Sequence, residues 1–299
     1  MDPTFSHGAD LAVIARRKDG NCGRGSSRGE GLRSPGGAYR PAGGRSGRRS
    51  RDRYRSERRV VGVPGRVLHR PQRAPDEPAL LHRVLEAAAA TGVDHVVYHS
   101  VAWPYTPEMP HHLDKARCED LLHTFGGVRW TVLQPCAYAE NFGAVLDGSV
   151  DTLEVPYDLD APFSFVALAD VAEAAARVLV EGAAVHHGAT YELGGPETIG
   201  VRQLCERAVR PVKASRISVA EWEERHGQGL TDDARARLAA MFDFYDRHGF
   251  VAGSAPLRGL LGRAPLALPS WSGRCELLLR SRRVGKGCDG SPRERPLCR

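Results

Sequence analysis

Long apolar runs are missing from this sequence. No segment reaches the ~18 consecutive apolar residues of a membrane-spanning helix, and residues 11–14 are too short for the roughly 7–15-residue core of a secretory signal. Paired cysteines are missing too, since the seven cysteines are scattered without a C-x-x-C motif. Scattered cysteines are typical of reduced thiols, not of a disulfide framework or a zinc site. We therefore expect a soluble, cytoplasmic protein.

Acidic side chains are scarce at both ends of the chain. Residues 1–60 carry 15 basic and 6 acidic side chains, a net charge of +9, and residues 261–299 carry 9 and 3, a net charge of +6. Residues 61–260 carry 18 and 27, a net charge of −9. The total of +6 is therefore an average over unlike regions, which disfavours one uniformly basic nucleic-acid-binding domain.

Apolar side chains are scarce in the first part of the chain. Residues 1–60 contain 11 Gly and 14 Arg, a composition that cannot bury enough apolar surface to offset chain entropy. The composition predicts disorder there. We divide the chain into an Arg/Gly-rich segment at 1–78, a folded region at 79–265 and a basic unstructured tail at 266–299.

Helical and strand-like segments alternate from residue 79 onward. Helices are predicted over residues 79–91, 112–125, 170–181, 201–209, 220–225 and 232–247. Strands or extended segments are predicted over residues 94–101, 128–133, 163–167, 189–193 and 215–219. This alternation implies a parallel sheet with helices on both faces, and hence the α/β fold class.

Polar or turn residues follow two of the apolar strands. Ser100 stands at the end of one strand, and Gln134 and Pro135 follow the next. A doubly wound sheet binds its ligand beyond the carboxyl ends of its strands. The sequence therefore predicts a binding site that includes these positions.

An ordered series of segments carries a family resemblance. The segments GVDHVVYHSV, RWTVLQPCAYAENF, FSFVALADVAEAAARVLVE and GATYELGGPE follow one another, and the series resembles the NmrA-like branch of the atypical short-chain dehydrogenase/reductases. The resemblance covers residues 79–265 and implies a Rossmann-like, doubly wound parallel sheet that binds NADP or NAD, with a small C-terminal substrate lobe. Some members of this branch reduce quinones, azo compounds or other small electrophiles, and others bind the dinucleotide without turnover as redox-sensing regulators.

The resemblance also implies roles for particular residues. Ser100 matches the serine beside the nicotinamide, and Lys115 matches the lysine that reaches the nicotinamide ribose. Pro135 and Ala137 match the backbone turn against the nicotinamide, and Asn141 matches a polar residue at the pocket edge. An ammonium suits the ribose role because it can donate to two hydroxyls and can lower the pKa of a neighbouring acid.

The expected proton donor departs from the family pattern. Short-chain dehydrogenases place a tyrosine four residues before the lysine, and this chain has His111 there. Imidazole can move protons near neutral pH, although a neighbouring ammonium favours its neutral form. Tyr105 lies ten residues from Lys115, too far to share a helical face by local spacing. We name Lys115, His111 and Ser100 as catalytic candidates, with a bound water as the alternative proton donor.

Several of these residues also have plainer interpretations. Ser100 can be a strand-end hydroxyl bonded to backbone. The histidine pairs at 111–112 and 186–187 lack other ligands at a suitable spacing, so no metal is expected. Asp170 is expected near a helix start, and Cys136 has no cation beside it in the sequence that would mark a reactive thiolate.

The strand, Gly-rich turn and helix that hold a dinucleotide's pyrophosphate are not recognisable at the amino terminus. Residues 20–25 contain glycines, but no apolar strand is predicted before them and no helical periodicity follows. Residues 1–78 nevertheless have the length of two to three βα units, at roughly 30 residues per βαβ unit. We interpret residues 1–78, and the tail after Leu268, as an out-of-frame reading caused by a frameshift in a GC-rich gene.

The predicted function is that of an NAD(P)(H)-dependent oxidoreductase acting on a small-molecule substrate. A non-catalytic NAD(P)-binding regulator with a protein partner is the first alternative. Nucleic-acid binding by the basic arms is the second, and it is disfavoured because Tyr39 and Tyr54 are the only strongly stacking aromatic residues among residues 1–60. No membrane partner is expected.

Overall fold

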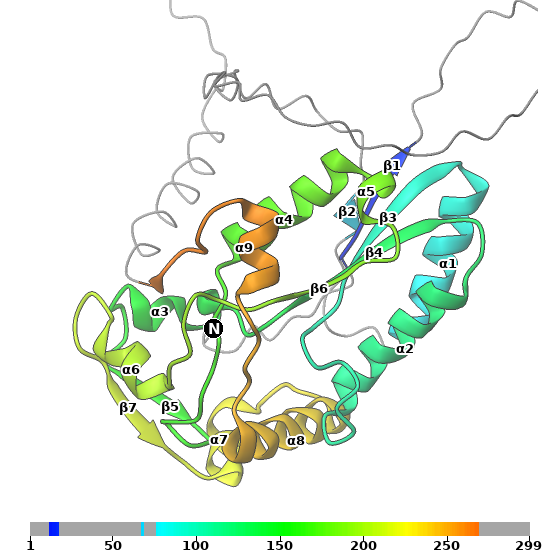
Figure 1. Ribbon diagram of the computed structural model, residues 1–299. Helices are drawn as coiled ribbons and strands as arrows, with labels where there is room; N and C mark the ends of the chain where they lie inside the picture. Colours follow the sequence, from blue (N-terminus) through cyan, green and yellow to red (C-terminus); the bar gives the residue numbers. More distant parts are fainter. Residues whose placement is uncertain (1–11, 18–66, 69–75, 269–299) are drawn as a thin grey trace, which may run out of the picture.

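The central sheet has five strands in the order β2-β1-β3-β4-β6, and three of them are parallel. The computed structural model describes residues 12–17, 67–68 and 76–268 (Figure 1). The parallel strands are β3 (Val93–His99), β4 (Arg129–Pro135) and β6 (Thr190–Leu193). Their β-branched, apolar composition suits a sheet that is covered on both faces. The predicted α/β class and Rossmann-like sheet are confirmed.

Two further strands lie in the Arg/Gly-rich segment 1–78, and the first of them lies within the residues 1–60 for which the composition predicted disorder. β1 (Ala12–Arg17) pairs antiparallel with β3, and β2 (Val67–Leu68) pairs antiparallel with β1. An apolar strand therefore does precede residues 20–25, contrary to the expectation. It was missed because its apolar run is short and ends in two arginines. Within the described residues the sheet is thus mixed, with an antiparallel pair beside the parallel strands.

Helices cover both faces of this sheet. α1 (Glu77–Ala90) and α2 (Pro110–Thr124) lie on one side, and α4 (Leu168–Glu181) lies on the other (Figure 1). Val96 and Tyr98 pack with α1 and α2, whereas Val97 belongs to the larger core that contains α4. Successive residues of β3 thus face opposite layers, as the two-residue period of a strand requires.

A smaller lobe is built from the segments that follow β4. Its parallel ribbon joins β5 (Thr152–Val155) and β7 (Lys213–Arg216). α7 (Val219–His226) and α8 (Asp232–His248) pack beside that ribbon. The short helices are η1 (Ala139–Phe142), α3 (Gly143–Leu146), α5 (Ala183–His186), α6 (Val201–Glu206) and α9 (Ala255–Leu261). Of these short helices, α5 and α9 pack with α4 and strands of the main sheet. The substrate role of the smaller lobe stays a prediction.

Helix boundaries follow local capping. α1 begins at Glu77, two residues before its predicted start, because the Asp76 side chain accepts a hydrogen bond from Ala79 N at 2.9 Å. α7 begins at Val219, inside a predicted strand, because Ser218 and Glu221 form a capping box. Polar caps therefore move these boundaries by a few residues and leave the helices themselves where they were predicted.

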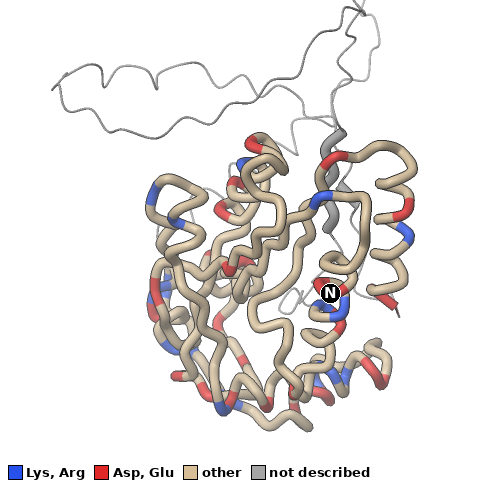
Figure 2. Tube along the Cα trace, turned by 45° about the vertical axis from the view of Figure 1, so that its right-hand side comes forward, with Lys and Arg blue, Asp and Glu red and all other residues tan. Residues whose placement is uncertain are grey.

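Charged residues of both signs are interspersed along the described trace (Figure 2). Many form surface ion pairs, such as Arg202 with Asp160 and Arg225 with Glu154. Arg237 of α8 reaches Asp114 of α2 at 2.6 Å and joins the lobe to the sheet layer. The described helices include none that is long and apolar enough to span a bilayer.

Several predictions fall on other parts of the chain. The residues at 1–11, 18–66, 69–75 and 269–299 lie outside the described residues. The frameshift interpretation, the glycine segment at 20–25 and the basic tail therefore stay predictions, as do the domain limits at 78 and 266.

Candidate functional site

The carboxyl ends of β3 and β4 meet at one edge of the sheet. Ser100 N donates to Leu133 O at 2.8 Å, and Ala102 N donates to Pro135 O at 2.9 Å. These backbone bonds continue the parallel pairing beyond the last strand residues. Ser100 and Pro135 are thereby brought to the same edge, as the strand-end argument predicted.

Ser100 belongs to a buried polar network. Its Oγ donates to Glu119 Oε1 in a short hydrogen bond, and Gln134 Nε2 donates to both carboxylate oxygens of Glu119 at 2.9 Å. All three side chains are buried. The Ser100 hydroxyl therefore bonds the Glu119 carboxylate, and not only backbone as the plainer interpretation expected. Glu119 lies on α2, and no local pattern near Ser100 indicates the contact.

Lys115 forms a buried ion pair. Its Nζ donates to Glu77 Oε1 at 2.7 Å and to His99 O at 3.3 Å, and the side chain is only 2% exposed. Tyr98 donates its hydroxyl hydrogen to the same Glu77 oxygen at 2.8 Å. Burial and the charge of Glu77 raise the pKa of Tyr98 well above its usual value, so the phenol stays protonated. The lysine side chain thus points toward the strand edge with its charge already satisfied.

A histidine and a tyrosine that the sequence argument did not select lie beside Lys115. The Tyr138 hydroxyl and His99 Nε2 share a hydrogen bond, and both side chains are partly buried. Burial and the charge of Lys115 lower the pKa of His99 to about 4, and burial raises that of Tyr138. The pair is therefore neutral near pH 7. Tyr138 could have been selected from the sequence, because it lies in the segment AYAEN directly after the predicted turn at Pro135.

The other candidates lie on the connections next to this edge. Ala137 O accepts a hydrogen bond from Val166 N at 2.9 Å, and Asn141 is partly exposed on η1. His111 lies in the first turn of α2, and its ring packs edge-on against His112 with centroids 4.6 Å apart. The roles of these residues, like those of Ser100 and Lys115, stay predictions.

Several residues with plainer interpretations have defined surroundings in the structure. His186 bonds Tyr191 at 2.8 Å and Glu181 at 2.9 Å, and no group of metal ligands is found among residues 12–17, 67–68 and 76–268. Asp170 lies in the first turn of α4, as predicted, and its carboxylate also accepts a hydrogen bond from Leu266 N at 2.6 Å. Burial raises the pKa of Cys136 to about 12, which agrees with an unreactive thiol.

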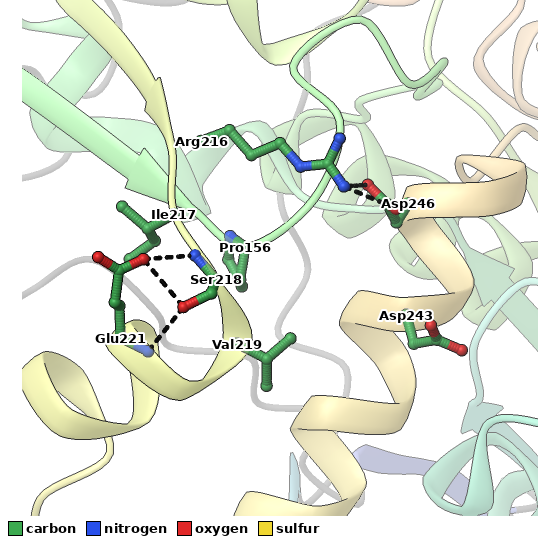
Figure 3. Close-up of a pocket in the computed structure, with 8 residues that line it drawn as sticks. All are labelled: Pro156, Arg216, Ile217, Ser218, Val219, Glu221, Asp243 and Asp246. Carbon is green, nitrogen blue, oxygen red and sulfur yellow. Dashed lines mark hydrogen bonds and ion pairs between the residues drawn. The ribbon is translucent and has the colours of Figure 1, made fainter.

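An open pocket lies elsewhere, between β7 and α8 in the smaller lobe (Figure 3). Arg216 pairs with Asp246 at 2.8 Å there, and Ser218 and Glu221 satisfy each other in the capping box. None of the predicted site residues lines this pocket. The strand edge is the stronger candidate site because it lies at the carboxyl ends of the parallel strands, where doubly wound sheets bind their ligands.

The direction of β1 bears on dinucleotide binding. Ala12 lies opposite His99 and Arg17 lies opposite Val93, so β1 starts at the candidate edge and ends at the far edge. In a Rossmann fold the first strand ends at the ligand edge and leads into the phosphate-binding turn. β1 therefore does not lead into the candidate edge in the way that the first strand of a Rossmann fold does, and the nicotinamide contacts of Ser100, Lys115, Pro135, Ala137 and Asn141 stay predictions. The described residues do not include a phosphate-binding turn.

Comparison with known proteins connects this fold with nucleotide-dependent reductases. No family model matches the chain, and no curated protein matches it. Among solved structures, the NADPH-dependent quinone oxidoreductase QOR2 of Escherichia coli, complexed with NADPH, is 25% identical with a TM-score of 0.57, over 69% of this chain and 74% of that one.

Two further structures extend the likeness in fold. The triphenylmethane reductase of Citrobacter sp., complexed with NADP(H), is 20% identical over 66% of this chain and 72% of that one, with a TM-score of 0.54. The negative transcriptional regulator NmrA, in complex with NAD, is 19% identical over 72% and 74%, with a TM-score of 0.53. The fold is thus the Rossmann-like fold that these NAD(P)-binding structures share. The predicted resemblance to the NmrA-like branch is confirmed by this likeness in fold.

Proposed function

We propose that this protein is an NAD(P)(H)-dependent oxidoreductase that reduces a small electrophile such as a quinone or an azo compound. The observation that carries the proposal is the match to a quinone oxidoreductase at 25% identity over 74% of that protein. The polar groups at the carboxyl ends of β3 and β4 support it, because ligands of doubly wound sheets bind there.

The residues at this edge would hold the nicotinamide half of the cofactor. A bound NAD(P)H supplies the hydride. The turn at Pro135 and Ala137 offers backbone groups to the nicotinamide, and Asn141 offers an amide at the rim. Lys115 would bind ribose hydroxyls, and Glu119 would hold the Ser100 hydroxyl in one orientation. Ser100 and Lys115 are each only 2% exposed, so a ligand reaches them after neighbouring side chains move.

Protonation of the reduced product needs a donor at the same edge. His111 is placed four residues before Lys115 on α2, and a bound water is the alternative. Tyr138 stays protonated and partly exposed. In the tautomer in which His99 Nε2–H donates to the Tyr138 oxygen, the phenol hydrogen is left to donate to a carbonyl oxygen. In this proposal His111 or water moves the proton and Tyr138 orients the substrate.

The test is NADPH oxidation by the full chain with a panel of quinones and azo dyes. We expect turnover that is lost in Lys115→Ala and retained in Lys213→Ala, an exposed lysine on β7. Turnover that survives Lys115→Ala would remove this residue from the proposed site. Absence of turnover with measurable NADPH binding would favour the second candidate function.

The second candidate is a non-catalytic dinucleotide-binding regulator with a protein partner. Two observations favour it: His111 replaces the usual tyrosine, and Lys115 is held by Glu77. Micromolar or tighter NADP binding without turnover would support this function. Titration with both NADP and NAD would also identify the preferred cofactor.

Cytoplasmic location and nucleic-acid binding by the basic arms stay predictions, since the arms lie largely outside the described residues. A salt-dependent shift of nucleic acid that is lost on deleting residues 1–60 would support the arm interpretation. No shift at low salt would exclude it.

A further inference from the structure

The positive charge of Lys115 is paired with a carboxylate of this chain. Glu77 Oε1 accepts from Lys115 Nζ at 2.7 Å and from the Tyr98 hydroxyl at 2.8 Å, and His99 O accepts from the same ammonium at 3.3 Å. The Tyr98 ring centroid lies 5.3 Å from Nζ. Lys115 is 2% exposed and Tyr98 is 0% exposed. The ion pair is therefore largely shielded from water. Attraction between charges is stronger in such surroundings than in water.

Three elements meet at this carboxylate. Glu77 is the first residue of α1, Tyr98 lies near the end of β3, and Lys115 lies in the second turn of α2. Glu77 is 16% exposed and is the most accessible member of the cluster. Tyr98 is held on a strand and Lys115 lies inside a helix, whereas Glu77 lies at a helix end. Movement of Glu77 is therefore the simplest way to free the ammonium.

We propose that Glu77 competes with the dinucleotide for Lys115, so that the nicotinamide ribose binds only when its hydroxyls replace the Glu77 carboxylate on Nζ. The proposal rests on the proposed function. It adds a residue that sets the affinity for a ligand with a ribose diol. Glu77 lies outside the residues that the family resemblance assigned, and 38 positions separate it from Lys115.

Competition has a defined thermodynamic consequence. If the ammonium is free in only a fraction of the molecules, the apparent dissociation constant is the intrinsic constant divided by that fraction. A fraction of about one tenth would make removal of the carboxylate tighten binding about tenfold. A residue that only stabilises the fold has the opposite signature, since its removal leaves binding unchanged or weaker.

The experiment is a fluorescence titration of the full chain with NADPH. Glu77→Gln keeps an acceptor for Tyr98 and removes the charge, and we expect it to bind NADPH about tenfold more tightly than the wild type while melting at a lower temperature. Adding Lys115→Met to it should abolish the gain. ADP, which lacks the nicotinamide ribose, should show no gain.

Two further variants keep the test decisive. Glu86→Gln changes an exposed glutamate on the same helix and should leave the affinity unchanged. Glu77→Asp retains the charge on a shorter side chain and serves if Glu77→Gln does not fold, with tighter binding again expected.

The outcomes separate this proposal from the proposed function. If the wild type binds NADPH and both Glu77→Gln and Glu77→Asp bind it equally or more weakly, the competition is overturned. The proposed function then still stands. NADPH binding by the variant alone supports both. No binding by the wild type or by either variant at millimolar NADPH overturns both, because freeing the ammonium would then have created no ribose site.

Discussion

His112 is 1% exposed, and its Nδ1–H donates to Trp103 O at 3.0 Å. Burial, together with the charge of Lys115, lowers the pKa of His112 from 6.5 to about 4. The unfolded chain therefore binds a proton between pH 6.5 and about 4 that the folded protein does not bind. Stability is then fully present above pH 6.5 and falls as the pH drops, by about 3 kcal/mol from this residue at pH 4.

Urea unfolding at pH 7, 6 and 5 measures this dependence. His112→Asn keeps a hydrogen-bond donor near Trp103 O and removes the titration, so its stability should fall less on acidification than that of the wild type. His82→Asn, at an exposed position on α1, should retain the wild-type slope. Equal slopes for His112→Asn and the wild type would show that this histidine is not buried in its neutral form.

Single residues at the site were predictable only in part. Ser100 and Lys115 could be selected because strand ends and the family series are local in the sequence. Glu119 could not be selected, because it meets Ser100 only through the packing of α2 on β3. Burial, which the sequence does not state, then decided that Lys115 is paired and that His99 is neutral.

The loop after β6 shows how elements are held together. A Cβ on Gly195 would lie 1.7 Å from Phe165 O, and Gly195 N donates to Ser164 O at 3.3 Å. Gly195→Ala would force this loop away from residues 163–166, and we expect a loss of about 3 kcal/mol of stability. The midpoint of urea unfolding measures that loss.

Gly253→Ala is the matched control, because nothing lies within 4 Å of a Cβ there. It should change stability little. A Gly195→Ala variant as stable as Gly253→Ala would mean that the loop is not packed against residues 163–166 as described.

The elements themselves were largely predictable, since the apolar runs of β3 and β4 and the helix formers of α1 are local signals. The glycines after β6 were predicted to terminate a strand. Their second role, a close backbone approach to residues 163–166 and 252–253, depends on chain segments that the sequence does not place beside them.

At the scale of the whole molecule, β1 covers one edge of β3 with six residues. A chain beginning at Asp76 would leave the backbone groups of that edge unpaired, and unpaired strand edges recruit other strands. We expect the shortened chain to self-associate and to melt at a lower temperature than the full chain. Light scattering and thermal melts measure both effects, and identical behaviour of the two chains would show that β1 contributes nothing to the sheet.

The sequence by itself determined the α/β class, most helices and strands from residue 76 onward, and the sheet edge that carries the candidate site. It could do so because strand burial, helix propensity and strand-end polarity are encoded within short windows. Only the tertiary structure decided that β1 runs antiparallel to β3, that Glu77 holds Lys115 and that His99 bonds Tyr138. Each of these joins residues at least 38 positions apart, and such contacts depend on the packing of whole elements.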